Sequence, residues 1–178
     1  MSAPKTLFRL DAKTGEIQRH STYHFDFLNV KSVQIGTDLF TISESSLSVV
    51  RYKGLDRFES LVKYNLSSYG EERYYCSIAN HDNFYIFLTG GWRKYDRKNS
   101  VYRYTLRGDS WKQIPSMTQP RESHSSIVFK EKLYVLGGYT DWDKGHTPLI
   151  ESLGFYTDKK WQAFVIKNLN LRAWPLVA

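Results

Sequence analysis

Two glycine pairs, each at the end of a short apolar run, constrain the fold of this chain more than any other feature. Gly90-Gly91 closes the run NFYIFLT and Gly137-Gly138 closes the run EKLYVL, so the pairs lie 47 residues apart. Alternating aromatic and aliphatic residues favour strands. A glycine pair at a strand end allows positive φ angles and close approach of a neighbouring backbone. The spacing therefore predicts a repeated β unit of about 50 residues.

The two units continue to match downstream of the glycines. Each has a loop, a second strand, a polar turn and a third strand that opens with tryptophan. In the first unit these parts are residues 100–105, the turn 108–109 and Trp111, and in the second they are residues 152–156, the turn 158–159 and Trp161. Polar turns between β runs predict hairpins, and a large aromatic residue supplies core area. On this alignment Tyr102 corresponds to Tyr156, and both tyrosines and both tryptophans are expected in the core.

Weaker copies of the unit flank these two. Residues 38–44 match the strand before a glycine pair, but Ser43 and Glu44 replace the glycines. The predicted division of this single repeat region is a partial unit at 1–30, a degenerate unit at 31–70, units at 71–117 and 118–167, and the start of another at 168–178. No stretch keeps a helical period with caps, so we expect few helices.

Composition narrows the classes of protein to which the chain can belong. Aromatic residues make up 16% of the sequence, which suits β structure, and the net charge of +7 favours acidic partners. No apolar run approaches the ~20 residues of a membrane helix, and residues 1–11 lack the apolar segment of a signal peptide. A single cysteine, Cys76, excludes an internal disulfide and favours a reducing compartment. We therefore expect a cytoplasmic protein, with the nucleus left open, and no membrane partner.

Catalytic and metal-binding motifs are absent from the sequence. The five histidines form no H-E-x-x-H motif, and one cysteine cannot form C-x-x-C. Cys76 lies on a predicted inner strand and is interpreted as a buried structural thiol rather than a nucleophile. The sequence thus predicts no catalytic residue, no metal site and no cofactor.

The order Gly-Gly, Tyr and then Trp about 20 residues later, in a period of about 50, resembles the kelch repeat. The residues that carry this resemblance are Gly90, Gly91, Tyr102 and Trp111, and then Gly137, Gly138, Tyr156 and Trp161. The Pro120-Arg121 step, with His124 after it, resembles the family's approach to its innermost strand. The resemblance, strongest over about 70–167, implies an all-β fold of kelch-type β-propeller blades, which are four-stranded antiparallel sheets around a channel.

The length predicts an incomplete ring. At about 50 residues per blade, 178 residues give roughly three and a half blades. Three explanations stay open: a fragment of a longer protein, a half-ring that completes itself by self-association, or the remnant of a gene.

The kelch resemblance also implies where ligands bind, namely the loop after each glycine pair and the loop that leads into the inner strand. These loops are residues 92–99, 139–147 and 118–124, and the candidate contacts are Arg121, Arg73, Arg172, Trp92, Arg93, Tyr95, Tyr139, Trp142 and His146. Arg121 is singled out because a guanidinium at the channel mouth could grip an acidic peptide. The alternative is that Arg121 only bonds the backbone of a neighbouring blade. Trp92 and Tyr139 are equally compatible with packing between blades.

The resulting hypothesis is a non-catalytic scaffold that binds a partner protein or an acidic peptide through the loops at one face of the propeller. One alternative is a fragment of a kelch-containing enzyme, either galactose-oxidase-like or sugar-processing. A nucleic-acid binder that uses the basic surface is a further alternative, which we regard as unlikely because no stacking motif accompanies the charge.

Overall fold

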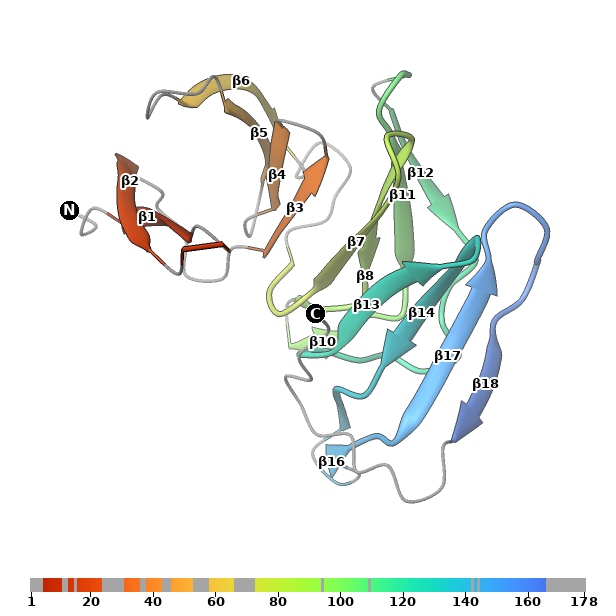
Figure 1. Cartoon of the computed structure of the whole chain (residues 1–178). Helices are drawn as coiled ribbons and strands as arrows, with labels where there is room; N and C mark the ends of the chain where they lie inside the picture. The colour runs from red at the N-terminus through yellow and green to blue at the C-terminus, as the bar shows by residue number, and fades with distance from the viewer. Residues whose placement is uncertain are drawn as a thin grey trace.

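The computed structural model describes residues 5–10, 13–14, 16–23, 31–35, 38–42, 46–52, 58–65, 73–93, 95–108, 110–141, 143 and 145–165. All regular structure in these residues is β-strand (Figure 1). None of them forms a helix with the length and apolar character needed to span a membrane.

Three four-stranded antiparallel sheets follow one another along the chain, after an N-terminal hairpin of β1 (Lys5–Leu10) and β2 (Ile17–Tyr23). The first blade contains β3 (Lys31–Ile35), β4 (Asp38–Ile42), β5 (Ser46–Tyr52) and β6 (Phe58–Asn65). The second blade contains β7 (Ser77–His81), β8 (Tyr85–Thr89), β11 (Val101–Thr105) and β12 (Ser110–Ile114). The third blade contains β13 (Ser125–Phe129), β14 (Lys132–Leu136), β17 (Leu149–Gly154) and β18 (Gln162–Val165). The predicted all-β fold of antiparallel blades is confirmed.

Small hairpins follow the two glycine pairs. One consists of β9 (Trp92–Arg93) and β10 (Asp96–Arg97), and the other of β15 (Tyr139–Asp141) and β16 (Gly145–His146). Gly90, Gly91, Gly137 and Gly138 all have positive φ angles between 53° and 96°. A Cβ atom on Gly90 would lie 2.5 Å from the Arg121 carbonyl oxygen, which explains why this position needs glycine.

The inner strands β3, β7 and β13 lie side by side, so the blades stack face to face around a common centre (Figure 1). Apolar residues fill the space between blades. Phe40 of the first blade packs with the second blade's Ile78 and Leu88, while Phe87 and Val101 pack with the third blade's Leu133. The ring is not closed within the described residues.

The two tryptophans that open the outer strands lie in these contacts, as predicted. Trp161 is 7% exposed, and its indole Nε1 donates a 2.7 Å hydrogen bond to the carbonyl oxygen of Pro115. Trp111 is half-buried against Tyr104, with ring centroids 5.1 Å apart. Each tryptophan therefore fixes the outer strand of its blade.

The predicted match of Tyr102 with Tyr156 is wrong. Val101 pairs with Thr89, and Ile150 pairs with Leu136 at the same position of the third blade, so Tyr102 corresponds to Glu151. Tyr156 lies in the turn after β17 and is 53% exposed, so its expected place in the core is also wrong. The error arose because residues 152–156 were matched to the strand 100–105, whereas β17 begins at Leu149 and ends at Gly154, before Tyr156.

The outer face of the third blade is open and apolar. On the second blade the corresponding face, which includes Val101 and Ile114, packs against the third blade. The equivalent residues on the third blade, Ile150 and Phe164, line a groove of about 420 Å³, and Phe164 is 40% exposed. The last described blade thus presents the type of surface that another blade covers elsewhere in the chain.

Candidate ligand-binding face

The loops predicted to bind ligands lie together at one end of the blades. We name this end the loop face; it comprises the hairpins β9–β10 and β15–β16 and the lead-in segments 73–76 and 121–124. Tyr74 exchanges two backbone hydrogen bonds with Trp92, of 2.9 and 2.7 Å, and Glu122 exchanges two with Tyr139, of 3.0 and 2.9 Å. Each lead-in segment is therefore tied to the hairpin of its own blade.

Arg73 and Arg121 occupy equivalent positions and form equivalent contacts. Arg73 Nη1 donates to the carbonyl oxygens of Gly90 and Ser100, at 2.8 and 3.0 Å, and Arg121 Nη1 donates to those of Gly137 and Leu149, at the same distances. These two residues are 2% and 0% exposed. Each guanidinium thus joins the end of one strand to the start of the next strand within its own blade.

This placement corrects the prediction that Arg121 points into an open channel mouth. The alternative holds for the main chain, because the Arg121 amide donates to the Lys98 carbonyl and the Arg121 carbonyl accepts from the Gly91 amide, both in the neighbouring blade. The carbonyl groups that the guanidinium binds belong to its own blade. Five donors in a rigid fork suit such a clamp between strands. A ligand would have to displace these bonds to reach either guanidinium, and a role of Arg121 or Arg73 in ligand binding remains a prediction.

A buried carboxylate completes the Arg121 site. Glu151 is 0% exposed, and its Oε1 lies 3.5 Å from Arg121 Nη2. The carboxylate also accepts hydrogen bonds from the Thr118 hydroxyl and from the backbone amides of Thr118, at 3.0 Å, and Gln119, at 3.3 Å. Burial lowers the pKa of Arg121, and the charge of Glu151 opposes this shift. The sequence did not point to Glu151, because Tyr156 was aligned with Tyr102 at the position of the repeat that Glu151 occupies.

Tyr95 is the most prominent side chain of the loop face. It lies at the tip of the β9–β10 hairpin with φ = 71°, and it is 94% exposed. Trp92 beneath it is half-buried, with its ring 6.1 Å from those of both Tyr74 and Tyr95. Trp92 therefore packs under the hairpin, while Tyr95 projects into solvent. Arg93 is partly buried beside them.

Arg97 and Glu122 join the hairpin of the second blade to the third blade. Arg97 Nε donates a 3.0 Å hydrogen bond to Glu122 Oε1, Nη2 lies 2.9 Å from the same oxygen, and the guanidinium stacks 4.7 Å from the centre of the Tyr139 ring. Arg97 is therefore paired, although it lies in a charged loop of the sequence. Its partner lies 25 residues away in the next repeat, and no local pattern shows that contact.

The β15–β16 hairpin places an aromatic ring beside an imidazole. The Tyr139 and His146 rings lie 5.4 Å apart in an edge-on arrangement, and His146 is exposed while Tyr139 is half-buried. Of the remaining predicted contacts, Trp142 and Arg172 lie outside the described residues. Among the candidates that the structure describes, Tyr95 and His146 are therefore the exposed ones.

Cys76 and His124 occupy equivalent buried positions beneath the loop face. Burial raises the pKa of the Cys76 thiol to about 11, so the uncharged thiol predominates at neutral pH. Burial and the charge of Arg121 lower the pKa of His124 to about 3, and its Nε2 lies 2.8 Å from the Thr89 hydroxyl. Within the described residues no three His, Cys, Asp or Glu side chains gather as metal ligands.

Comparison with known proteins supports the repeat seen in the structure. The family model described as "Kelch motif" matches residues 72–118. The chain is 32% identical over 90 residues to an F-box/kelch-repeat protein of Arabidopsis thaliana, covering 48% of this chain and 25% of that protein. It is 30% identical over 96 residues to Kelch repeat and BTB domain-containing protein 12 of Danio rerio, covering 48% and 15%. The chain thus spans a quarter or less of these relatives.

A solved structure shows the same fold. The structure of YjhT superposes with a TM-score of 0.68 at 14% identity, and the match covers 84% of this chain and 54% of that chain. At this identity the likeness concerns the fold alone. The motif match and this likeness of fold agree that one repeated unit explains the glycine pairs, the four-stranded blades and the tryptophan positions.

Proposed function

We propose that this kelch-repeat chain is a non-catalytic scaffold that binds a partner protein through its loop face. Several relatives have kelch repeats together with a BTB domain or an F-box in their names, and the matches cover 15–25% of those proteins. What a propeller segment of this kind contributes is a rigid surface of loops. The proposal therefore concerns the loops and not the parts of those relatives that this chain does not match.

The observation that carries the proposal is the presentation of Tyr95. Its side chain is 94% exposed, although the hairpin beneath it is fixed by the Tyr74–Trp92 backbone bonds and by the Arg97–Glu122 ion pair. An exposed aromatic ring on a rigid support loses little conformational entropy on binding, and tyrosine is enriched among the residues that dominate interfaces. Tyr95 is thus suited to be an anchor for a partner protein.

We further infer that the partner is acidic, because the chain has a net charge of +7. Positive surfaces accelerate association with acidic proteins, and this effect falls with ionic strength. The side chains of Arg93 and His146 lie on the same face as Tyr95 and supply basic groups there.

Affinity purification with matched variants tests this function. Partners captured by the wild-type chain would be quantified against those captured by Tyr95→Ala and by Lys112→Gln, a variant at an exposed position of the outer strand β12. We expect Tyr95→Ala to lose a specific partner by about tenfold or more, and Lys112→Gln to retain it. Equal capture by Tyr95→Ala and the wild type would refute the role of the loop face.

We also propose that the chain self-associates through the open face of the third blade. Phe129 and Phe164 are 57% and 40% exposed on this face and line its apolar groove, and an exposed apolar groove of this kind is typical of an interaction site. Light scattering during size exclusion should show a dimer that Phe164→Glu converts to a monomer. A wild-type chain that remains monomeric at every concentration would contradict this proposal.

A further inference from the structure

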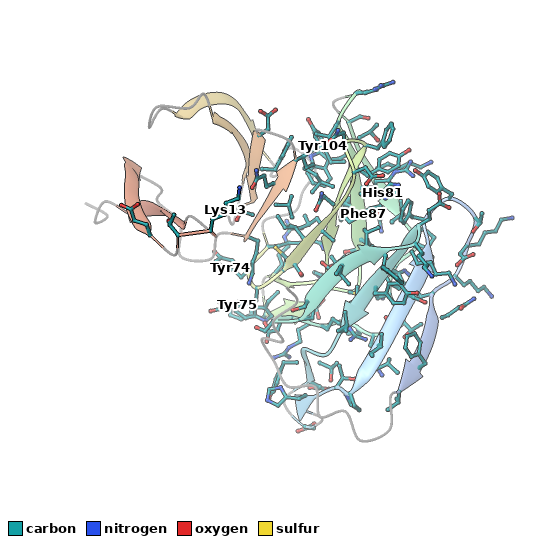
Figure 2. The ribbon with its side chains drawn as sticks, viewed as in Figure 1. Lys13, Tyr74, Tyr75, His81, Phe87 and Tyr104 are labelled. Atoms are coloured by element: carbon teal, nitrogen blue, oxygen red, sulfur yellow. The ribbon has the colours of Figure 1, made fainter. Side chains whose placement is uncertain are left out.

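We infer that the end of the blades opposite the loop face carries a second interaction surface, fitted to an acidic segment of a partner protein. This end, which we name the turn face, contains the β7–β8, β11–β12, β13–β14 and β17–β18 turns. Figure 2 shows Tyr74 and Tyr75 at the start of β7 and His81 at its other end, so the two faces are separated by the length of the blade. The inference goes beyond the proposed function, because a different set of residues carries it.

Aromatic side chains form a continuous patch across the second and third blades at the turn face. We name this set the aromatic patch; it consists of Phe84, Tyr85, Phe155 and Tyr156. The Phe155 ring lies 4.7 Å from Tyr156, and the Tyr85 ring lies 6.0 Å from Tyr156. Phe84 and Tyr156 are 45% and 53% exposed. Exposed aromatic area that spans two packed blades is typical of an interaction surface.

Two arginine side chains lie against this patch. The Arg103 guanidinium stacks 4.5 Å from the centre of the Tyr85 ring, and that of Arg107 lies 5.8 Å from the centre of the Phe84 ring. Within the part of the chain that the structure describes, neither guanidinium forms an ion pair or a hydrogen bond, and Arg103 Nε is buried without a hydrogen-bond partner. Stacking holds both groups in place while leaving their Nη donors for a ligand.

The nearby carboxylates do not neutralise these arginines. Asp82 lies 3.9 Å from His81 Nε2, and Asp158 accepts hydrogen bonds from the Gly154 amide and the Thr157 hydroxyl, at 2.8 and 3.0 Å. These bonds lower the pKa of Asp158. Glu131 is exposed near Tyr156, whose pKa is raised by desolvation, by the neighbouring Tyr85 and by the charge of Glu131. Asp82, Asp158 and Glu131 are thus charges among the described residues that would oppose an acidic ligand.

A protein segment that alternates acidic and apolar side chains fits this surface better than a nucleic acid does. Carboxylates would pair with the two guanidiniums, and apolar side chains would cover Phe84 and Tyr156. Bases bind single aromatic rings by stacking on their faces. Here one guanidinium lies over the Tyr85 ring and another over the Phe84 ring, so one face of each ring is less accessible to a base.

Fluorescence anisotropy with a short labelled peptide of alternating glutamate and leucine tests the inference. We expect Arg107→Gln and Arg103→Gln each to weaken binding by about tenfold, since a hydrogen bond to a charged group is worth about 1.5 kcal/mol or more. Removal of the opposing charge in Glu131→Gln should strengthen binding by about threefold. Lys13→Gln is the matched charge control, because Lys13 is exposed in the turn between β1 and β2, away from this face (Figure 2).

Three results would overturn the inference. These are equal binding by Arg107→Gln and the wild type, an equal loss in Lys13→Gln, and tighter binding of a labelled oligouridine than of the acidic peptide. Arg107 is exposed in a turn, so its substitution leaves the core intact even if Arg103→Gln fails to fold. Tyr95→Ala should bind the peptide like the wild type, and this variant separates a failure at the turn face from a failure at the loop face.

Discussion

Replacement of Arg121 by methionine should destabilise the chain strongly, whether or not a ligand is present. Methionine fills the space of the arginine stem but leaves the carbonyl oxygens of Gly137 and Leu149 buried without donors. The buried Glu151 carboxylate loses its ion-pair partner at the same time. Removal of one member of a buried pair typically costs about 3–5 kcal/mol. That is a large part of the roughly 5–15 kcal/mol that stabilises an ordinary domain.

Urea unfolding followed by tryptophan fluorescence measures this effect. With an m value of about 2–3 kcal/mol/M, the midpoint should fall by about 1–2 M in Arg121→Met. Arg107→Met is the matched control, and its midpoint should stay close to that of the wild type because Arg107 is exposed in a turn.

The double variant Arg121→Met/Glu151→Gln tests the pairing itself. Glu151→Gln alone should destabilise the wild type, because Glu151 also accepts the bonds from Thr118 and Gln119. In the Arg121→Met background it should cost less, because it removes an unpaired buried charge, and we expect a coupling of about 1 kcal/mol or more. An Arg121→Met chain that unfolds at the wild-type urea concentration would refute the clamp and favour a purely ligand-binding role.

Three further predictions follow from buried positions near the glycine pairs. In the same urea assay, Gly90→Ala should lower the free energy of unfolding by about 3 kcal/mol or more, and Gly145→Ala by about 1 kcal/mol. Both glycines have positive φ, but of the two only Gly90 has backbone and His124 atoms within 2.6 Å of the added Cβ. Equal losses of stability in the two variants would contradict this reasoning. His124 is neutral in the fold, because its pKa is about 3 there and 6.5 in the unfolded chain. The free energy of unfolding should therefore fall by about 1 kcal/mol per pH unit from about pH 6 towards pH 3, as the unfolded state takes up the proton. A His124→Gln chain whose stability depends on pH as steeply would argue against this. Cys76, with a pKa near 11, should react with a thiol reagent at pH 8 much more slowly in the native chain than in urea, and similar rates would show that the thiol is not buried.

The repeat could be predicted from the sequence where it depends on local chemistry. Gly90 and Gly91 must have positive φ, and the apolar run before them can only be a buried strand, so the blade and its end follow from neighbouring residues. Trp161 was identified for the same reason, because a large ring after a polar turn needs a core.

What the sequence could not show depends on contacts between residues that are far apart in the chain. Glu151 accepts a hydrogen bond from the backbone amide of Thr118, which lies 33 residues away in the chain. Arg97 donates a hydrogen bond to Glu122, which belongs to the next blade. An arginine in a lead-in segment can face either solvent or its own strands, and only the positions of two carbonyl groups decide between them at Arg121. Tyr156 was misplaced because the sequence does not mark the boundaries of β17, which ends at Gly154, two residues before this tyrosine.

The central claim is that the loop face binds a partner protein, and the hydrogen-exchange footprint of a captured partner tests it most directly. We predict slower exchange in the β9–β10 and β15–β16 hairpins when the partner is bound, with no change on the outer face of the third blade. Protection confined to the turns at the opposite end of the blades, or no protection in either hairpin, would contradict the claim.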